Sequence, residues 1–306
     1  MAEFLVGRLF RVVITLWLIV TLVFFATRFT GNTIDYLMPE GLDAESRAAM
    51  IAYLGLDQPY LDQYWRYLRS IADGEFGISL FERRPVSTIV AERVWPSVSL
   101  LLAAFVVTLL IGFPLGVVAA LKRSSPVGTG IMAAAFLGYA IPNFVLSILL
   151  LLVFSYSLHW LPSSGSGGLL HYVMPTTALA AFFIAGLVRY TRNAMLDVLS
   201  QDYMRTARAK GLDERVVIFK HGVRNALITV ITVLGLQITT LVSGSVIIEA
   251  VFAWRGIGDL LVASTIQRDY PVLQFGVLAV AGVVVTVNLA VDLLYAAADP
   301  RVRLGG

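Results

Sequence analysis

Apolar runs of about 20 residues recur along this 306-residue chain, and they restrict its fold more than any other feature. A helix of that length crosses about 30 Å of hydrocarbon, where each backbone amide must be paired inside its own segment. Hydrophobic residues make up 58% of the chain and charged residues 14%, with a mean hydropathy of +0.80. We therefore predict an all-α polytopic membrane protein with six spans, at residues 9–29, 98–121, 131–154, 170–188, 227–248 and 272–297.

Lysine and arginine predict the orientation of these spans, because short cytoplasmic loops carry an excess of both. With both termini inside, the inside segments hold 14 basic residues, whereas the short outside segments hold 3, namely Arg28, Arg255 and Arg268. The polar stretch 30–97 is too long for this rule and is expected outside the membrane. Since the basic residues lie beside apolar runs, they do not indicate a nucleic-acid partner.

Three parts are predicted along the chain: an N-terminal membrane helix over 1–29, an external region over 30–97 and a membrane domain over 98–306. Within the external region we predict helices over 40–54 and 57–71. The second of these places Tyr60, Tyr64 and Tyr67 on one face, at a spacing of three to four residues. Such a face is typical of packing or of an aromatic belt at the membrane interface, and a partner-docking surface is the alternative.

Polar side chains inside the predicted spans are candidates for a path across the membrane. Asn143 lies in the third span, Gln237 in the fifth and Asn288 in the sixth. A polar group at this depth either lines a cavity or bonds a neighbouring helix, and the sequence leaves both readings open. In the second span, Gly112 and Gly116 predict close contact with another helix.

The polar segment 195–226 interrupts two apolar runs and is predicted to be a cytoplasmic loop. Good helix formers up to Lys210 are followed by Gly211, the residue type that most often closes a helix in the left-handed conformation. A second short helix is expected from Asp213 to about His221, at an angle to the first.

Small residues in this loop indicate a docking surface. Ala207, Ala209 and Gly211 would let another protein approach the backbone closely, and basic side chains surround them: Arg205, Arg208, Lys210, Arg215, Lys220 and Arg224. The alternative is an ordinary positively charged loop of an inner-membrane protein.

Several activities are excluded by the motifs of the chain. No lysine is followed by Ser or Thr, so the chain has no phosphate-binding P-loop, and any ATP would have to be bound by another subunit. There is no cysteine, and His159 and His171 are a weak metal signal. An ion-coupled transporter working alone would need paired ionisable groups or an inverted repeat, and a hydrolase would need a facing nucleophile and base; the sequence shows neither pattern.

The stretch 202–211, DYMRTARAKG, resembles the cytoplasmic coupling loop of ABC importer permeases, in the form found in the dipeptide, oligopeptide, nickel and glutathione branch. Further matches to this branch are LGLDQP at 54–59, DGEFGIS at 73–79, RDYP at 268–271, NLAVDLLYA at 288–296 and DPRVR at 299–303. Arg205 departs from the general loop pattern, which has Glu there, and Arg224 with Asn225 replace a common Leu-Pro pair.

The resemblance implies a five-helix importer core preceded by an extra N-terminal span, in a bacterial inner membrane. It implies that a cleft of an ATPase subunit receives the loop residues Arg205, Thr206, Ala207, Arg208, Ala209, Lys210, Gly211, Arg224 and Asn225. It further implies a second related permease, two ABC ATPase subunits, an extracytoplasmic solute-binding protein and surrounding membrane lipid. The chain itself would be a transport subunit rather than an enzyme and would hold no cofactor, because ATP and magnesium bind to the ATPase subunits. The solute could be a dipeptide, an oligopeptide, glutathione, nickel or another compound.

Overall fold

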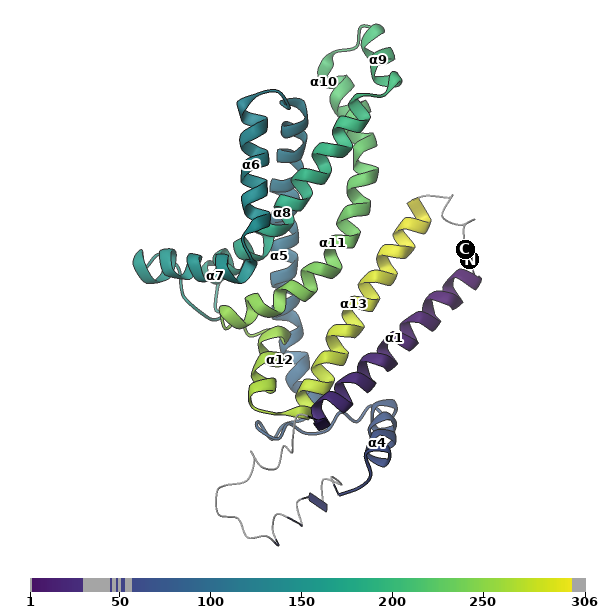
Figure 1. Cartoon of the computed structure of the whole chain (residues 1–306), viewed down its shortest axis with the longest axis vertical. Coiled ribbons are helices and arrows are strands. Elements are labelled where there is room, and N and C mark those ends of the chain that lie inside the picture. Colours follow the sequence, from purple (N-terminus) through teal and green to yellow (C-terminus); the bar gives the residue numbers. More distant parts are fainter. Residues whose placement is uncertain (1, 30–44, 46–47, 49–50, 53–56, 299–306) are drawn as a thin grey trace. The chain divides into compact units, whose positions relative to one another are not determined.

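The computed structural model describes residues 2–29, 45, 48, 51–52 and 57–298, and this part of the chain is helical almost throughout (Figure 1). Its α-helices are α1 (Ala2–Phe29), α4 (Tyr60–Ala72), α5 (Val86–Leu121), α6 (Pro126–Ala140), α7 (Asn143–Leu150), α8 (Leu169–Leu199), α9 (Asp202–Ala209), α10 (Glu214–Val216), α11 (Arg224–Val251), α12 (Ile257–Ile266) and α13 (Tyr270–Ala298). There are also two π-helical segments. The first, η1 (Leu151–Ser157), extends α7, and the second, η2 (Val217–Val223), joins α10 to α11. The predicted all-α class is confirmed.

Five stretches of the described helices are long and apolar enough to cross a membrane: Gly7–Phe29, Val86–Leu121, Leu169–Leu199, Glu214–Gly235 and Tyr270–Leu289. The pair Pro126–Ala140 and Asn143–Ser157 would make a sixth, but its two parts meet at an angle of 98°. The multi-span prediction is therefore confirmed, and the span predicted over 131–154 corresponds to this bent pair rather than to one continuous helix.

Pro142 explains this bend. Proline disfavours the helical conformation of the residue before it, and Ile141 accordingly has the extended angles φ −83° and ψ 119°. The chain leaves α6 at this point and enters α7 in a new direction, so an apolar run that is continuous in sequence becomes two helices.

Two other helices extend beyond their predicted limits. The helix α5 begins at Val86 rather than at residue 98, so the end of the predicted external region is continuous with a span. The helix α8 contains Pro175 and runs to Leu199, which places Arg189 and Arg192 within the helix rather than at its end. The helix predicted over 57–71 is confirmed as α4, with Pro59 as its N-cap, whereas most of the one predicted over 40–54 lies outside the described residues.

The described residues form two compact units. The first unit combines residues 1–95 with Gly256–Leu289, and the second combines Pro96–Arg255 with Ala290–Ala298. The predicted division at residues 29 and 97 stays a prediction.

Aromatic packing attaches α4 to α1 in the first unit. Tyr64 is buried, its hydroxyl lies 2.7 Å from Thr21 Oγ1, and its ring stacks on Phe25. Tyr67 stacks on Phe24, with 5.3 Å between the ring centroids. Of the aromatic face predicted for this helix, Tyr64 and Tyr67 therefore serve packing, whereas Tyr60 is exposed.

A buried carboxylate also holds the first unit together. Asp269, just before α13, accepts a hydrogen bond from the hydroxyl of Ser79 and others from the backbone N–H groups of Leu80 (3.3 Å) and Phe81 (3.4 Å). These bonds attach the turn after α4 to the start of the last helix, across 190 residues of sequence.

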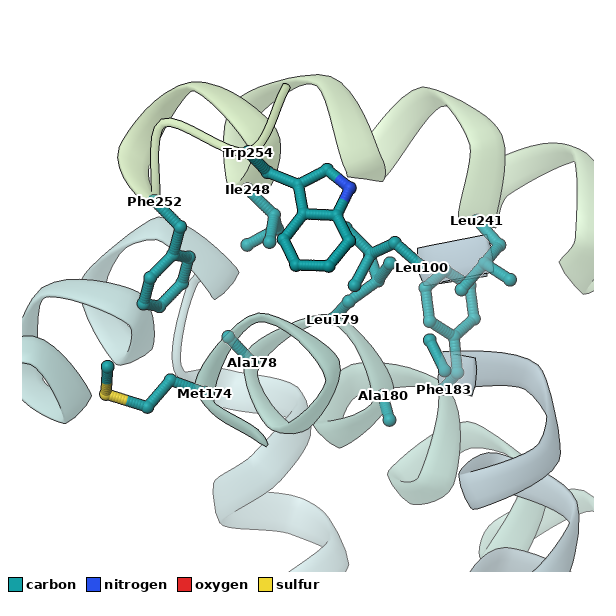
Figure 2. Close-up of a cluster of buried hydrophobic side chains, with 11 residues drawn as sticks. Leu100, Met174, Ala178, Leu179, Ala180, Phe183, Leu241, Ile248, Phe252 and Trp254 are labelled. Carbon is teal, nitrogen blue, oxygen red and sulfur yellow. The ribbon is translucent and has the colours of Figure 1, made fainter. Parts of the chain in front are cut away.

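The helix α8 is central to the second unit, where α6, α7 and α11 all pack against it. Figure 2 shows part of this core, in which Leu179 of α8 meets Leu100 of α5 and the indole of Trp254. Trp254 is fully buried, and its Nε1 donates a hydrogen bond to the carbonyl oxygen of Pro96 at 2.9 Å.

Small residues bring α5 and α8 into close contact, as the sequence predicts. A Cβ atom on Gly112 would lie 3.0 Å from Leu187 Cδ2, and one on Gly116 would lie 2.5 Å from Thr191 Cβ. Close approach of this kind is how helices associate inside a membrane, where lipid removes the hydrophobic driving force between them.

The substitution Gly116→Ala is expected to destabilise the protein by about 1–3 kcal/mol, because the new methyl group has no room beside Thr191 and the carbonyl oxygen of Val188. Gly130→Ala in α6 is the matched control, since no atom of the described chain lies within 4 Å of the added Cβ. The free energy of unfolding of this control should stay unchanged or rise by up to about 1 kcal/mol, because alanine has a higher helix propensity than glycine. Thermal unfolding of the two purified variants in detergent measures the difference, and equal midpoints would contradict the close contact.

Candidate functional site

The loop between α8 and α11 forms a compact helical hairpin, here named the α9–α10 hairpin (residues 201–223), which lies at one end of the two long helices of the second unit (Figure 1). Its first helix ends before Gly211, whose φ of +74° is the left-handed cap that the sequence predicts. The carboxylate of Asp213 then accepts a hydrogen bond from the backbone N–H of Arg215 at 2.8 Å and starts the second helix. This second helix continues through η2 directly into α11.

A small core holds the two arms of the hairpin together. Met204 and Val217 are fully buried and Ala207 is 7% exposed, all three in one cluster. Ala207 therefore faces the inside of the hairpin, and the small-residue surface proposed from sequence is reduced to Ala209 and Gly211, which are exposed. The spacing of α9 explains this, because Met204 and Ala207 are three residues apart and so share one face.

An ion pair joins the two arms on the outside. Arg208 Nη2 lies 2.9 Å from Glu214 Oε1, and Arg208 Nε lies 3.1 Å from Glu214 Oε2. The hydrogen bond raises the pKa of Arg208 and lowers the pKa of the Glu214 carboxyl below its ordinary value. The side chain of Arg208 thus stabilises the shape of the hairpin. Arg205 forms a longer ion pair, with its Nη1 3.7 Å from Asp202 Oδ1.

Two other predicted loop residues bond to backbone carbonyl groups one helical turn earlier in the chain. Thr206 Oγ1 donates to the carbonyl oxygen of Asp202 at 3.1 Å, and Asn225 Nδ2 donates to that of His221 at 2.6 Å. Lys210 and Arg224 are exposed.

The outer surface of the hairpin carries apolar side chains that the sequence argument did not select. Their exposed fractions range from 40% to 63%, and they are Tyr203, Leu212, Val216 and Phe219. They alternate along the chain with exposed basic residues, so the surface combines apolar contact area with positive charge. The sequence contained a signal for this surface, since large apolar residues in a charged loop either pack inward or form a contact surface for another protein.

The three candidate path residues have different local surroundings. Asn143 lies at the start of α7 and lines a pocket of about 290 Å³ in the second unit, with Tyr139, Phe182 and Thr240 among its walls. Gln237 of α11 packs against α8, where a Cβ on Gly186 would lie 2.9 Å from its Nε2. Asn288 is exposed and belongs to the first unit.

Asn143 is the best placed of the three. Its side-chain amide is half-buried and makes no hydrogen bond to another helix among the described residues, so the bonding role left open by the sequence is not observed. One wall of its pocket is fixed by Tyr139, which stacks on Phe182 at 4.8 Å and lies under the guanidinium of Arg189 at 5.1 Å. Within residues 57–298 and the described N-terminal part, no three potential metal ligands come together.

Comparison with known proteins places the chain in a family. Residues 112–304 match the model of the binding-protein-dependent transport system inner membrane component. The glutathione transport system permease protein GsiC of Salmonella paratyphi A is 41% identical over 99% of both chains. Its counterpart from Escherichia coli K12 is 40% identical, also over 99% of both chains.

Solved structures show the same fold. An inward-facing conformation of the MetNI methionine ABC transporter matches 70% of this chain and 97% of its own, with a TM-score of 0.61 and 18% identity. An amino acid ABC transporter crystallised with histidines matches 68% of this chain and 93% of its own, with a TM-score of 0.55 and 14% identity.

The family match covers more than half of the chain, and relatives near 40% identity span its whole length. The chain therefore belongs to the binding-protein-dependent inner-membrane transport components and is a permease subunit of an ABC importer, a transport component rather than an enzyme.

Proposed function

We propose that this permease imports glutathione or a related short peptide, and that the α9–α10 hairpin couples it to ATP hydrolysed by two partner subunits. The single observation that carries the coupling proposal is the outer surface of the hairpin, where Phe219 is 63% exposed beside basic side chains. Exposed aromatic residues with neighbouring positive charge are typical of a docking surface.

The connections of the hairpin suit it to transmit motion. One arm is joined to the end of α8 by a short turn, and the other continues as helix into α11. A partner that closes on ATP would move the hairpin as a unit, because Met204, Val217 and the Arg208 ion pair hold its arms together. Such a partner shifts the permease between two states only if it contacts the hairpin differently in each.

The complete assembly in this proposal has a second related permease, two ATPase subunits that bind ATP and magnesium, and an extracytoplasmic solute-binding protein. The basic hairpin then faces the cytoplasm, as do both termini, and α4 with the turn at Ser79 faces outward. Among the coupling residues, Ala209, Lys210, Gly211 and Arg205 are accessible to the ATPase, and Ala207 and Arg208 maintain the shape of the hairpin.

Gly211→Trp is expected to abolish co-purification of the ATPase while leaving a folded permease. No atom of the described chain lies within 4 Å of the Cβ position, so the indole would project outward into the docking surface. Gly74→Trp is the matched control, because it places the same side chain at nearly the same positive φ, +77° against +74°, and no atom lies within 4 Å of its Cβ position either. Gly74 follows α4 in the first unit, away from the hairpin sequence. Affinity purification from detergent, followed by identification of bound subunits, measures the effect.

A second pair of variants tests side-chain contact with the ATPase without changing a residue at positive φ. Phe219→Ser should weaken ATPase binding by at least about tenfold if the ring is a central contact, whereas Phe81→Ser, also 63% exposed but in the first unit, should not. If the chain purifies without any ATPase and still moves solute in vesicles lacking ATP, the coupling proposal is wrong.

Glutathione is proposed as solute because the two GsiC relatives compared above are named as glutathione transport system permeases. The test is uptake of radiolabelled glutathione by cells expressing the complete transporter, with dipeptides, oligopeptides and nickel as unlabelled competitors. Competition by glutathione alone supports the assignment. Stronger competition by a longer peptide or by nickel would reassign the solute without affecting the coupling proposal.

Asn143→Leu is expected to reduce solute uptake by about tenfold, equivalent to about 1.4 kcal/mol, by removing an amide from the pocket. Asn193→Leu is the control, since Asn193 is exposed on α8 and does not line that pocket. Uptake is measured at matched membrane levels of the two variants. Unchanged uptake with Asn143→Leu would remove this residue from the proposed path.

A further inference from the structure

A second pocket, of about 340 Å³, lies in the first unit among α1, α4 and α13. Its apolar wall includes Ile71 of α4 and Phe275 and Leu278 of α13. Its polar lining includes Arg28 at the end of α1, together with Tyr67 and Glu75. The transport proposal uses none of these residues.

Arg28 is a half-buried cation that has no anionic partner among the residues that the structure describes. Its guanidinium lies 5.2 Å from the centroid of the Phe24 ring, and no carboxylate of the described chain is within ion-pair distance. Its Nε is buried without a hydrogen-bond partner in the described residues. Removing a charge from water is costly unless an opposite charge or a hydrogen bond compensates, so the pocket is suited to an anion.

Tyr67 adds a hydrogen-bond donor to this site. Its ring stacks on Phe24, the same ring that Arg28 covers, so the two polar groups share one aromatic support. Burial raises the pKa of Tyr67 to about 12, and the phenol therefore stays protonated at neutral pH. Among the described residues its hydroxyl is not engaged in a hydrogen bond, which leaves it free for a ligand.

The location of the pocket points to the kind of anion. Arg28 is the penultimate residue of the apolar stretch Gly7–Phe29, the position at which a span reaches the headgroup region. Phe275 and Leu278 are three residues apart on α13 and so form an apolar strip that runs into the membrane-spanning part of that helix. The pocket thus combines a cationic end with an apolar wall.

We propose that this pocket binds one anionic phospholipid, with the phosphate against Arg28 and Tyr67 and an acyl chain along Phe275 and Leu278. Arginine suits this role because its planar fork can donate two parallel hydrogen bonds to a phosphate. A free phosphate or a carboxylate solute would use the cationic end alone and would leave the apolar wall empty. Glu75 is exposed at the pocket and opposes the anion, so it limits the affinity of the site.

The experiment uses the full chain co-expressed with its transporter partners and purified in mild detergent. The complex is mixed with micelles containing phosphatidylglycerol or phosphatidylcholine, separated from free lipid, and its bound lipid is counted by mass spectrometry. Arg28→Gln should lower retained phosphatidylglycerol by about five- to tenfold, the effect of losing a charge-assisted hydrogen bond. Arg66→Gln, an exposed arginine on α4, removes the same charge outside the pocket and should change nothing.

Glu75→Gln supplies a test that does not depend on the stability of the Arg28 variant. It removes the opposing charge from an exposed position and should increase retention of phosphatidylglycerol but not of phosphatidylcholine. Equal retention by wild type, Arg28→Gln and Glu75→Gln would overturn the proposal. Displacement of the lipid by millimolar inorganic phosphate as effectively as by phosphatidylglycerol would also overturn it, because the site would then be one for free anions.

Discussion

Hydrocarbon offers no hydrogen bonds, and this constraint governs the structure. Each backbone amide in a span must be paired within its own helix, so the apolar stretches of the chain can cross only as helices. Their association then depends on close packing rather than on the hydrophobic effect, which explains the contact of Gly116 with Thr191 and the central place of α8. The break at Pro142 is the exception, since the backbone there leaves helical geometry at the edge of a pocket.

The same constraint explains why coupling can occur at a distance. Helices whose backbone hydrogen bonds are satisfied internally behave as stiff elements. The α9–α10 hairpin follows the end of α8 and leads directly into α11. The hairpin keeps its shape through Met204, Val217 and the Arg208 ion pair. In the coupling that we propose, a partner at its exposed surface would act on α11 through continuous helix and on α8 through the turn at 200–201.

Much of the candidate coupling site could be predicted from sequence, because its geometry is local. The end of α9 and the left-handed Gly211 follow from helix propensity and the absence of a Cβ. The inward turn of Ala207 and the outward position of Phe219 were missed, since both depend on how the two arms pack together. Likewise, Pro142 predicts a break at Ile141, but the direction that α7 takes after it depends on packing against α8.

By itself the sequence determined that the chain crosses a membrane several times as helices. It also determined which polar loop interrupts the spans and which family the motifs resemble. These properties depend on composition and on short motifs, which involve only a few neighbouring residues. Only the tertiary structure decided which polar residues share a cavity. Asn143 reaches a pocket because α6 and α7 meet at 98°, and Arg28 of α1 shares a second pocket with residues of α4 and α13. Such arrangements join segments as far apart as 247 residues, as in the hydrogen bond from Gln274 to Thr27, and no local sequence pattern predicts them.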